Sequence, residues 1–169
     1  MINEENNLDE LDNKILRLIS NNARISFLEV ARICNVSGAA IHQRIQKLMA
    51  SNIITGSQFT LNVNKIGYET CAYVSLYFDP EADLEAVVEQ IKLIPEVVEC
   101  HFTTGSYDLL IKVFARNNSH LHEIIQSRIR PLGLRRSEST ISYRESFHRQ
   151  ITLGGDFDID ISNATTEDL

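Results

Sequence analysis

Residues 37–47 carry small and polar side chains at the spacing of one helix face. Gln43 and Gln46 can each pair with N6 and N7 of adenine, and the methyl group of Ala39 can contact a thymine methyl. Lys47 can bind a phosphate. Such a face suits a helix that reads base edges in the major groove of DNA. The expected DNA-binding residues are Arg32, Ser37, Gly38, Ala39, Ala40, His42, Gln43, Arg44, Gln46 and Lys47.

The residues around this face predict how the helix would meet a duplex. The small side chains of 38–40 allow close approach to the groove, and the first-turn amides favour a phosphate. Arg44 on one flank and Arg32 on the preceding helix suit phosphate contacts, as do residues 55–58. His42 lies on the other flank, where a helical histidine can also remain without a special role.

Three short amphipathic helices are expected to position this face. The second starts with a capping box, Ser26 to Glu29, and the third starts after Ser37. Asn52 suits a left-handed position after the third helix. From the pattern alone, a small helical core without DNA contacts remains an alternative. The predicted inward residues are Leu11, Ile15, Leu18, Ile19, Phe27, Val30, Ala31, Cys34, Ile41, Ile45, Leu48 and Met49.

The remaining pattern predicts a wing and a second domain. Residues 53–63 read as two short strands, which makes residues 1–60 a winged helix-turn-helix domain. Residues 61–68 are expected to form a linker strand. Residues 69–150 then alternate as βαββαβ, with strands at 69–78, 97–103, 107–115 and 137–147. The first helix is expected from an apolar stripe over 84–94 that Pro95 closes, and the second is expected to be capped by Asn118 or Ser119. The expected fold class is therefore α+β, with a ferredoxin-like second domain and an acidic tail at 151–169.

The charge is unevenly distributed along the chain. The net charge is −7, yet residues 13–52 hold six basic residues and one acidic residue. Residues 1–12 and 151–169 hold five acidic residues each. Because a surface field is felt over roughly one Debye length, about 10 Å, a locally basic module remains compatible with DNA binding.

Other classes of protein and site are disfavoured. No apolar run approaches the roughly 20 residues of a membrane span, and the polar start of the chain does not suit a signal peptide. Cys34, Cys71 and Cys100 fit neither zinc nor disulfide spacing, so reduced thiols in the cytoplasm are expected. The sequence shows no catalytic constellation, and no metal or cofactor is expected. The histidines at 101, 120, 122 and 148 and the calcium-like spacing of 156–167, with Ile161 at the glycine position, do not change this.

The chain resembles the leucine-responsive / AsnC (feast/famine) transcription regulators over residues 8 to about 150. Asn52 departs from this pattern, since a glycine is common there in the family. The resemblance rests on Leu8-Asp9, Asp12, Ile15-Leu16, residues 22–26, Val30-Ala31, Val36-Ser37, Arg44-Ile45, Leu48, residues 53–56, Ile66-Gly67-Tyr68 and the loop Thr104-Gly105-Ser106-Tyr107-Asp108.

The resemblance implies a sequence-specific DNA-binding regulator that is not an enzyme. Its second domains would dimerise through the sheet, and the dimers would assemble into tetramers or octamers. An amino acid would bind between dimers, at Gly105, Tyr107, Asp108, Ser137 and Ser139. The two serines stand where the family often has threonine.

The chemistry of the loop allows two interpretations. The carboxylate of Asp108 can bind a ligand ammonium, and amides of the Gly105 turn can hold a ligand carboxylate. Alternatively, Gly105 makes a turn, Asp108 caps it and Tyr107 packs. Two other functions stay open: a sirohaem-decarboxylase-like enzyme using His101 and His148, and a DNA architectural protein without an effector.

Overall fold

The computed structural model describes residues 8–151. The described chain forms two compact units, residues 8–59 with 149–151, and residues 60–148. Within residues 8–151, no helix has both the length and the apolar character needed to cross a membrane.

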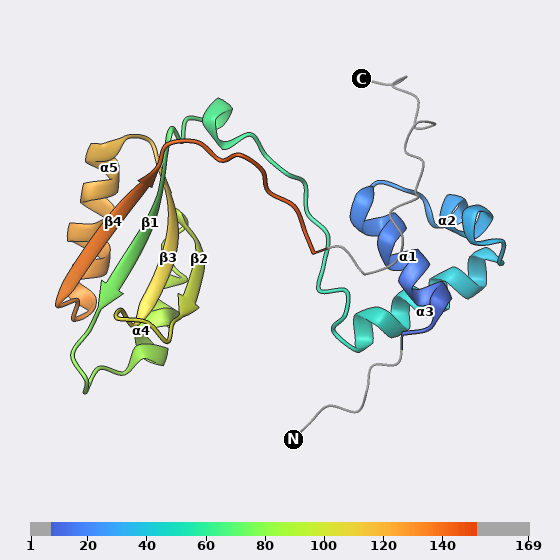
Figure 1. Ribbon diagram of the computed structural model, residues 1–169, viewed down its shortest axis with the longest axis horizontal. Coiled ribbons are helices and arrows are strands. Elements are labelled where there is room, and N and C mark those ends of the chain that lie inside the picture. Colours follow the sequence, from blue (N-terminus) through green and yellow to red (C-terminus); the bar gives the residue numbers. More distant parts are fainter. Residues whose placement is uncertain (1–7, 152–169) are drawn as a thin grey trace. The chain divides into compact units, whose positions relative to one another are not determined.

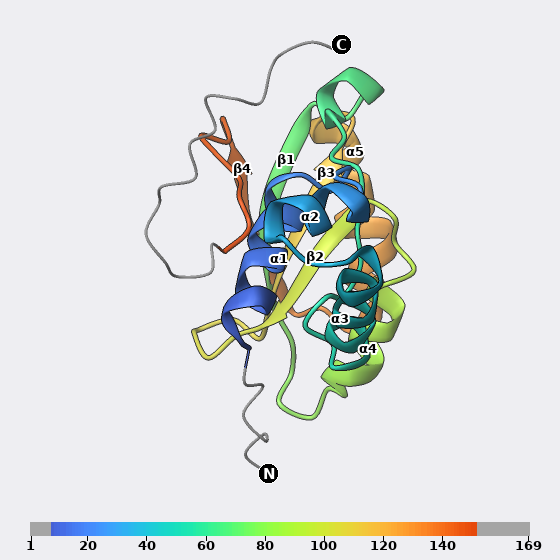
Figure 2. The ribbon, with the colours of Figure 1, turned by 90° about the vertical axis from the view of Figure 1, so that its right-hand side faces the viewer.

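The first unit consists of three helices, α1 (Glu10–Asn21), α2 (Phe27–Cys34) and α3 (Gly38–Ala50), labelled in Figure 2. Each helix is preceded by a short polar side chain that accepts a hydrogen bond from the backbone amide three residues later. Asp9 accepts from Asp12, Ser26 from Glu29 and Ser37 from Ala40. Asn35 adopts a left-handed conformation between α2 and α3, with φ of 53°. This tight turn gives the pair its helix-turn-helix form.

The core of the first unit follows the predicted apolar spacing with two exceptions. Buried residues Ile15, Val30, Ala31, Ile41 and Ile45 form the centre, and Leu11, Leu18, Ile19, Cys34 and Ile54 pack around it. The prediction that Phe27 and Met49 point inward was wrong, since they are 44% and 46% exposed. Phe27 is the first residue of α2, where its ring lies at the rim beside His42, and Met49 lies near the end of α3.

The predicted wing does not form. Asn52 has the expected left-handed conformation, with φ of 56°, but residues 53–62 contain no strand. Phe59 and Leu61 alternate as a strand would, yet they are 73% and 65% exposed. An isolated two-stranded hairpin is marginally stable in water, so alternation without a covering core does not produce one.

The predicted linker strand at 61–68 is also absent. Instead, Val63–Ile66 form a 3₁₀ turn (η1). The side chain of Asn62 accepts a hydrogen bond from the Lys65 amide, and Gly67 ends the turn with φ of 94°. These two local signals, a capping residue and a left-handed glycine, outweigh the apolar alternation around them.

The second unit is a four-stranded antiparallel sheet with two helices. Its strands are β1 (Thr70–Tyr77), β2 (Val97–Phe102), β3 (Leu109–Ala115) and β4 (Arg136–Ser142), in the order β2-β3-β1-β4 (Figure 1). Helix α4 (Leu84–Ile91) joins β1 to β2, and α5 (Asn118–Glu123) follows β3. This is the predicted ferredoxin-like βαββαβ arrangement, so the α+β fold class is confirmed.

The segment after α5 is more irregular than predicted. Asn117, one residue earlier than expected, caps α5. A π-helical turn (η2, Ile124–Ile129) and a 3₁₀ turn (η3, Arg130–Leu132) then lead to Gly133, with φ of 87°. Strand β4 ends at Ser142 rather than Phe147, because Ser142 pairs with Cys71 near the first residue of β1 and no partner strand continues beyond it.

The two faces of the sheet differ in character. Alternate residues Ala72, Val74 and Leu76 of β1 pack with β3 and both helices into one core, which also holds Val87, Val88, Ile91, Leu109, Ile111, Val113, Leu121, Ile124, Ile125 and Ile129. No helix of this unit covers the other face, in the part of the chain that the structure describes. We call it the open face; it comprises Cys71, Tyr73, Ser75, Tyr77, Glu99, His101, Leu110, Lys112, Phe114, Arg136, Glu138 and Thr140.

Candidate DNA-binding and effector-binding sites

Helix α3 separates its side chains as a recognition helix requires. Its apolar residues Ile41, Ile45 and Leu48 are buried, and Ile41 and Ile45 lie in one core with residues of α1 and α2. On the opposite side, four of the predicted base-reading or phosphate-binding side chains are exposed, namely Ala39, Gln43, Gln46 and Lys47. One face of α3 therefore offers two amides, one ammonium and one methyl group to an approaching surface.

The start of α3 is small and well capped. The hydroxyl oxygen of Ser37 accepts a hydrogen bond of 3.2 Å from the Ala40 amide. A Cβ atom added to Gly38 would meet nothing within 4 Å, so the unit itself does not require glycine there. Gly38 and Ala39 are exposed. The backbone of this turn is therefore accessible to a groove or a phosphate.

Arg44 is held by acidic residues of α1 and its cap. Its Nη1 atom donates to Asp12 Oδ1 at 2.8 Å and to Asp9 Oδ2. The hydrogen bond from Arg44, followed by that from the Asp12 amide, lowers the pKa of Asp9 below its ordinary value. Sequence reasoning placed Arg44 on a DNA-facing flank and did not foresee these partners, because Asp9 and Asp12 are more than 30 positions away.

Some other basic side chains of the first unit already contact groups of the protein, whereas others form no ion pair in the described residues. Lys14 donates to the Ile33 carbonyl at 2.9 Å, and the Arg24 guanidinium lies 5.1 Å from the centre of the Phe59 ring. Arg32 and Lys47 are exposed and have no ion pair within residues 8–151. His42, also exposed, lies beside the Phe27 ring at 6.3 Å between centroids.

The loop between β2 and β3 is tied down by its own hydrogen bonds. Thr103 donates through its backbone amide to the Asp108 carbonyl at 3.0 Å and through Oγ1 to the Tyr107 carbonyl. The Asp108 carboxylate accepts a 2.7 Å hydrogen bond from the Phe78 amide. Tyr107 packs edge-on against Tyr77, with 6.2 Å between ring centroids. Asp108 thus caps the end of β1 and Tyr107 packs against a neighbouring ring, as the interpretation without a ligand expects.

Gly105 is not explained by the loop alone. Its φ lies outside the left-handed region, and an added Cβ would meet nothing within 4 Å. A turn made by this subunit alone would accept alanine. The described chain therefore does not itself require glycine at position 105.

Ser137 and Ser139 lie on the helix-covered side of β4. Ser137 pairs in register with Leu76 and Ser139 with Val74. Leu76 also accepts the Asp108 amide hydrogen at 3.0 Å. Strand β1 therefore runs between Asp108 on one side and Ser137 on the other. One subunit places both residues at the same end of the sheet, but they do not surround a common ligand position.

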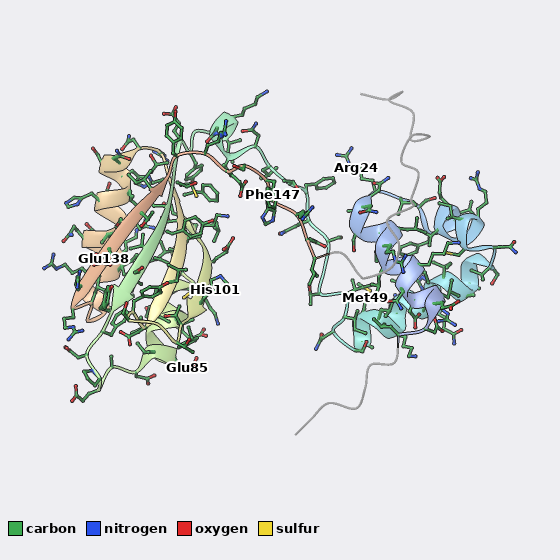
Figure 3. The ribbon with its side chains drawn as sticks, in the orientation of Figure 1. Arg24, Met49, Glu85, His101, Glu138 and Phe147 are labelled. Atoms are coloured by element: carbon green, nitrogen blue, oxygen red, sulfur yellow. The ribbon has the colours of Figure 1, made fainter. Side chains whose placement is uncertain are left out.

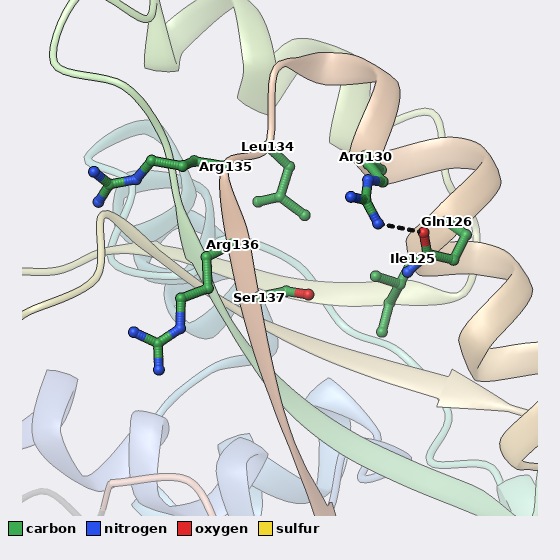
Figure 4. Close-up of a pocket in the computed structure, with 7 residues that line it drawn as sticks. All are labelled: Ile125, Gln126, Arg130, Leu134, Arg135, Arg136 and Ser137. Atoms are coloured by element: carbon green, nitrogen blue, oxygen red, sulfur yellow. Dashed lines mark hydrogen bonds between the residues drawn. The ribbon is translucent and has the colours of Figure 1, made fainter.

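A hollow beside β4 was missed by the sequence analysis. Gln126 and Arg130 of the turns after α5 face Ser137 across it (Figure 4). The sequence signal was weak, because Arg130 precedes Pro131 in what reads as an ordinary helix end. The π-helical turn that presents Gln126 has no clear signature in the residue pattern.

The open face carries an almost buried lysine at its centre. Lys112 is 8% exposed and donates to Glu99 at 3.2 Å, with Glu145 at 3.9 Å. Burial lowers its pKa, but the Glu99 hydrogen bond and nearby charges raise it more, so the net shift is upward. Its Nζ atom also lies 5.7 Å from the Tyr73 ring centre and 5.6 Å from that of Phe114.

The histidines proposed for an alternative function belong to no metal-type cluster in the described residues 8–151. His101 is on β2 and Glu138 on β4, at opposite edges of the sheet (Figure 3). His101 lies 3.6 Å from Glu99, and His120 lies 3.7 Å from Glu96. His148 is exposed. Within residues 8–151, no three histidine, cysteine or acidic side chains lie together as a metal site would require.

Family profiles match both units. The AsnC-type helix-turn-helix domain matches residues 8–49, and the Lrp/AsnC ligand binding domain matches residues 71–151. The regulatory protein AsnC of Haemophilus influenzae is 32% identical over 146 residues, covering 86% of this chain and 97% of the relative. The transcriptional regulator Ptr1 of Methanocaldococcus jannaschii is 34% identical over 125 residues, covering 74% of this chain and 84% of the relative.

Solved structures show the same arrangement of elements. Escherichia coli AsnC has a TM-score of 0.79 at 27% identity, with 86% of this chain and 98% of that chain covered. A Neisseria meningitidis transcriptional regulator, solved with L-methionine, has a TM-score of 0.80 at 21% identity, with 87% of this chain and 96% of that chain covered. With both domain profiles matched in order and AsnC similar over nearly its full length, this chain belongs to the Lrp/AsnC family of transcription regulators.

Proposed function

We propose that this regulator reads DNA through the exposed face of α3 and responds to a small effector bound by its second unit. The observation that carries the DNA-binding proposal is the partition of α3. Ile41, Ile45 and Leu48 are buried, while Gln43, Gln46 and Lys47 are exposed beside a capped, small-residue start. Because a polar helix face with accessible amides fits the major groove, Gln43 and Gln46 are assigned to base edges.

The phosphate contacts follow from which cations are available. Lys47 and Arg32 are exposed without ion pairs in the described chain, so they are assigned to phosphates, with residues 37–40 and His42 at the rim of the contact. Arg44 is reassigned from phosphate contact to positioning, since Asp9 and Asp12 hold it. It locks α3 against α1 and so sets the angle of the reading face.

The open face is the proposed dimer interface. It combines aromatic rings and a nearly buried lysine on a surface that no helix of its own unit covers. Two sheets that pack face to face bury such rows of alternate residues. A two-fold dimer would present two α3 helices to half-sites spaced by one helical turn or a multiple of it. Assembly of dimers into tetramers or octamers belongs to the same proposal.

The effector site is proposed at Gly105, Tyr107 and Asp108 with Ser137 and Ser139. The structure solved with L-methionine in a fold relative supports an amino acid as the ligand. Gly105 has space that its own subunit does not use. Because β1 separates Asp108 from Ser137 within one subunit, a ligand touching both sets would lie between subunits.

DNA reading is tested by operator binding at about 150 mM salt, with sites found by genome-wide footprinting. Gln43→Ala with Lys47→Ala should abolish specific binding, whereas Gln90→Ala, an exposed glutamine on α4, should leave it unchanged. Intact specific affinity in the double variant would show that α3 is not the reader.

The effector proposal is tested by thermal shift against the twenty amino acids. A ligand present at 100 times its dissociation constant should stabilise the protein by about 2.7 kcal/mol. Binding must then alter operator affinity, because a regulator responds only if the ligand prefers one state. If no amino acid raises the melting temperature while DNA binding is intact, the result would instead favour an architectural role.

A further inference from the structure

The second unit contains an open hollow of about 200 Å³ between the turns after α5 and the start of β4. This is room for a few waters or one small organic molecule. Figure 4 shows its position beside the strand. The lining residues are Ile125, Gln126, Arg130, Leu134, Arg135, Arg136 and Ser137.

Arg130 is the cation that faces this hollow. Its Nη1 atom donates to Gln126 Oε1 at 2.8 Å, and the Ser137 hydroxyl points toward the same region from β4 (Figure 4). Within residues 8–151, Arg130 has no carboxylate partner, whereas nearby Arg128 pairs with Glu96 at 3.0 Å. A guanidinium with free N–H groups therefore borders the space.

The other two arginines belong to the rim. In Figure 4 the guanidinium groups of Arg135 and Arg136 lie on the far side of β4 from Arg130. Arg136 pairs with Glu138 and stacks over the Tyr77 ring, 5.0 Å from its centre. No aspartate or glutamate lines the hollow, so its local charge stays positive.

Two apolar side chains, Ile125 and Leu134, complete the lining. Ile125 is buried in the core, and Leu134 packs against the same core. Ile125 and Gln126 belong to a π-helical turn, a rare conformation that often occurs at functional sites. The hollow thus combines an apolar wall with one guanidinium, one amide and one hydroxyl.

We infer that this hollow binds the side-chain carboxylate of the effector, so that the effector is an acidic amino acid or a related dicarboxylic acid, whose other polar groups lie at the Gly105 and Asp108 loop in the effector site proposed above. Arg130 would hold the carboxylate through two parallel N–H···O bonds, the geometry that a guanidinium fork favours. The Ser137 hydroxyl and the Gln126 amide nitrogen would donate to the same oxygens, and Ile125 and Leu134 would contact the methylene groups. This inference rests on the proposed effector response and names the class of effector.

Isothermal titration calorimetry on the full-length protein tests the inference. L-Glutamate should bind, while L-glutamine, its neutral isostere, should bind roughly ten- to a hundredfold more weakly, the range expected for one charge-assisted contact. Arg130→Gln should remove this preference, and Arg130→Lys should recover part of it. Arg116→Gln, which removes an exposed arginine charge elsewhere in the unit, serves as the matched control.

The outcomes separate this inference from the proposed effector response. Glutamate binding that Arg130→Gln leaves unchanged, in a variant with an unchanged melting temperature, would overturn the inference. Tight binding of a neutral amino acid that depends on Asp108 would also overturn it while leaving the effector proposal standing. Inorganic phosphate binding as tightly as glutamate would overturn carboxylate selectivity. Arg130-dependent glutamate binding without any change in operator affinity would support the site and refute the regulatory response.

Discussion

Arg44 on α3 donates a 2.8 Å hydrogen bond to Asp12 on α1, whose side chain is only 4% exposed. Removing the partner of a buried charge is strongly destabilising, so the pair ties α3 to the rest of its unit. Asp9 binds the same guanidinium nitrogen from the cap of α1. The connection spans 32 positions in sequence and sets the orientation of α3.

Arg44→Ala should therefore destabilise the first unit without removing a DNA phosphate contact. The expected loss in unfolding free energy is about 1–3 kcal/mol, because the buried Asp12 carboxylate loses its guanidinium partner. In operator titrations over a range of salt concentration, the slope of log affinity against log salt should stay as in the unmodified protein. Lys47→Ala should lower that slope by about one. A drop in slope with Arg44→Ala would restore its role as a phosphate ligand.

The free energy of unfolding of the same unit should decrease at acidic pH because of Asp9. Its pKa is lowered in the folded state, chiefly by the Arg44 hydrogen bond, so its contribution is present above the ordinary value of 3.8 and is lost as pH falls below it. Urea unfolding should show Asp9→Asn less stable than the unmodified protein at pH 7, and this difference in stability should be smaller at pH 3. An equal difference at both pH values would contradict the linkage.

Substitutions at Asp108 should separate structure from effector binding. Asp108→Asn keeps an oxygen for the Phe78 amide, which donates at 2.7 Å, but removes the negative charge. We expect Asp108→Asn to retain most of the stability and Asp108→Ala to lose about 1–3 kcal/mol. Both should lose binding of a ligand ammonium in calorimetry. Normal ligand binding by Asp108→Asn would restrict Asp108 to capping β1.

A charge placed on the open face should disrupt dimers. Tyr73 lies at the centre of that face, opposite Lys112 of β3 and Thr140 of β4. Tyr73→Asp should shift the protein toward monomers in sedimentation velocity, since burying a carboxylate in place of an aromatic ring at an interface is costly. Gln90→Asp adds the same charge on α4, away from the open face, and should leave the dimer intact. Unchanged sedimentation of Tyr73→Asp would place the interface elsewhere.

Local sequence signals determined most of the elements. A capping side chain and the amide it binds lie three residues apart, so Ser26 and Ser37 mark helix starts without reference to the rest of the fold. Apolar residues recur about every 3.6 residues in α3 and every second residue in β1, and this period likewise identifies the buried side of each element. The βαββαβ order then restricts the sheet to few topologies, which is why the fold class could be predicted.

Only the tertiary structure decided which polar groups are already occupied. Residues 53–62 alternate like strands but lack a core to cover them, and Arg44 is held by acids more than 30 positions earlier. The hollow with Arg130 arises where a π-helical turn meets β4, two segments that come together only through the sheet. Such contacts depend on long-range packing, and short-range spacing carries no record of them. The sequence by itself therefore determined the elements and their buried faces, whereas the folded chain decided which charges remain free to bind.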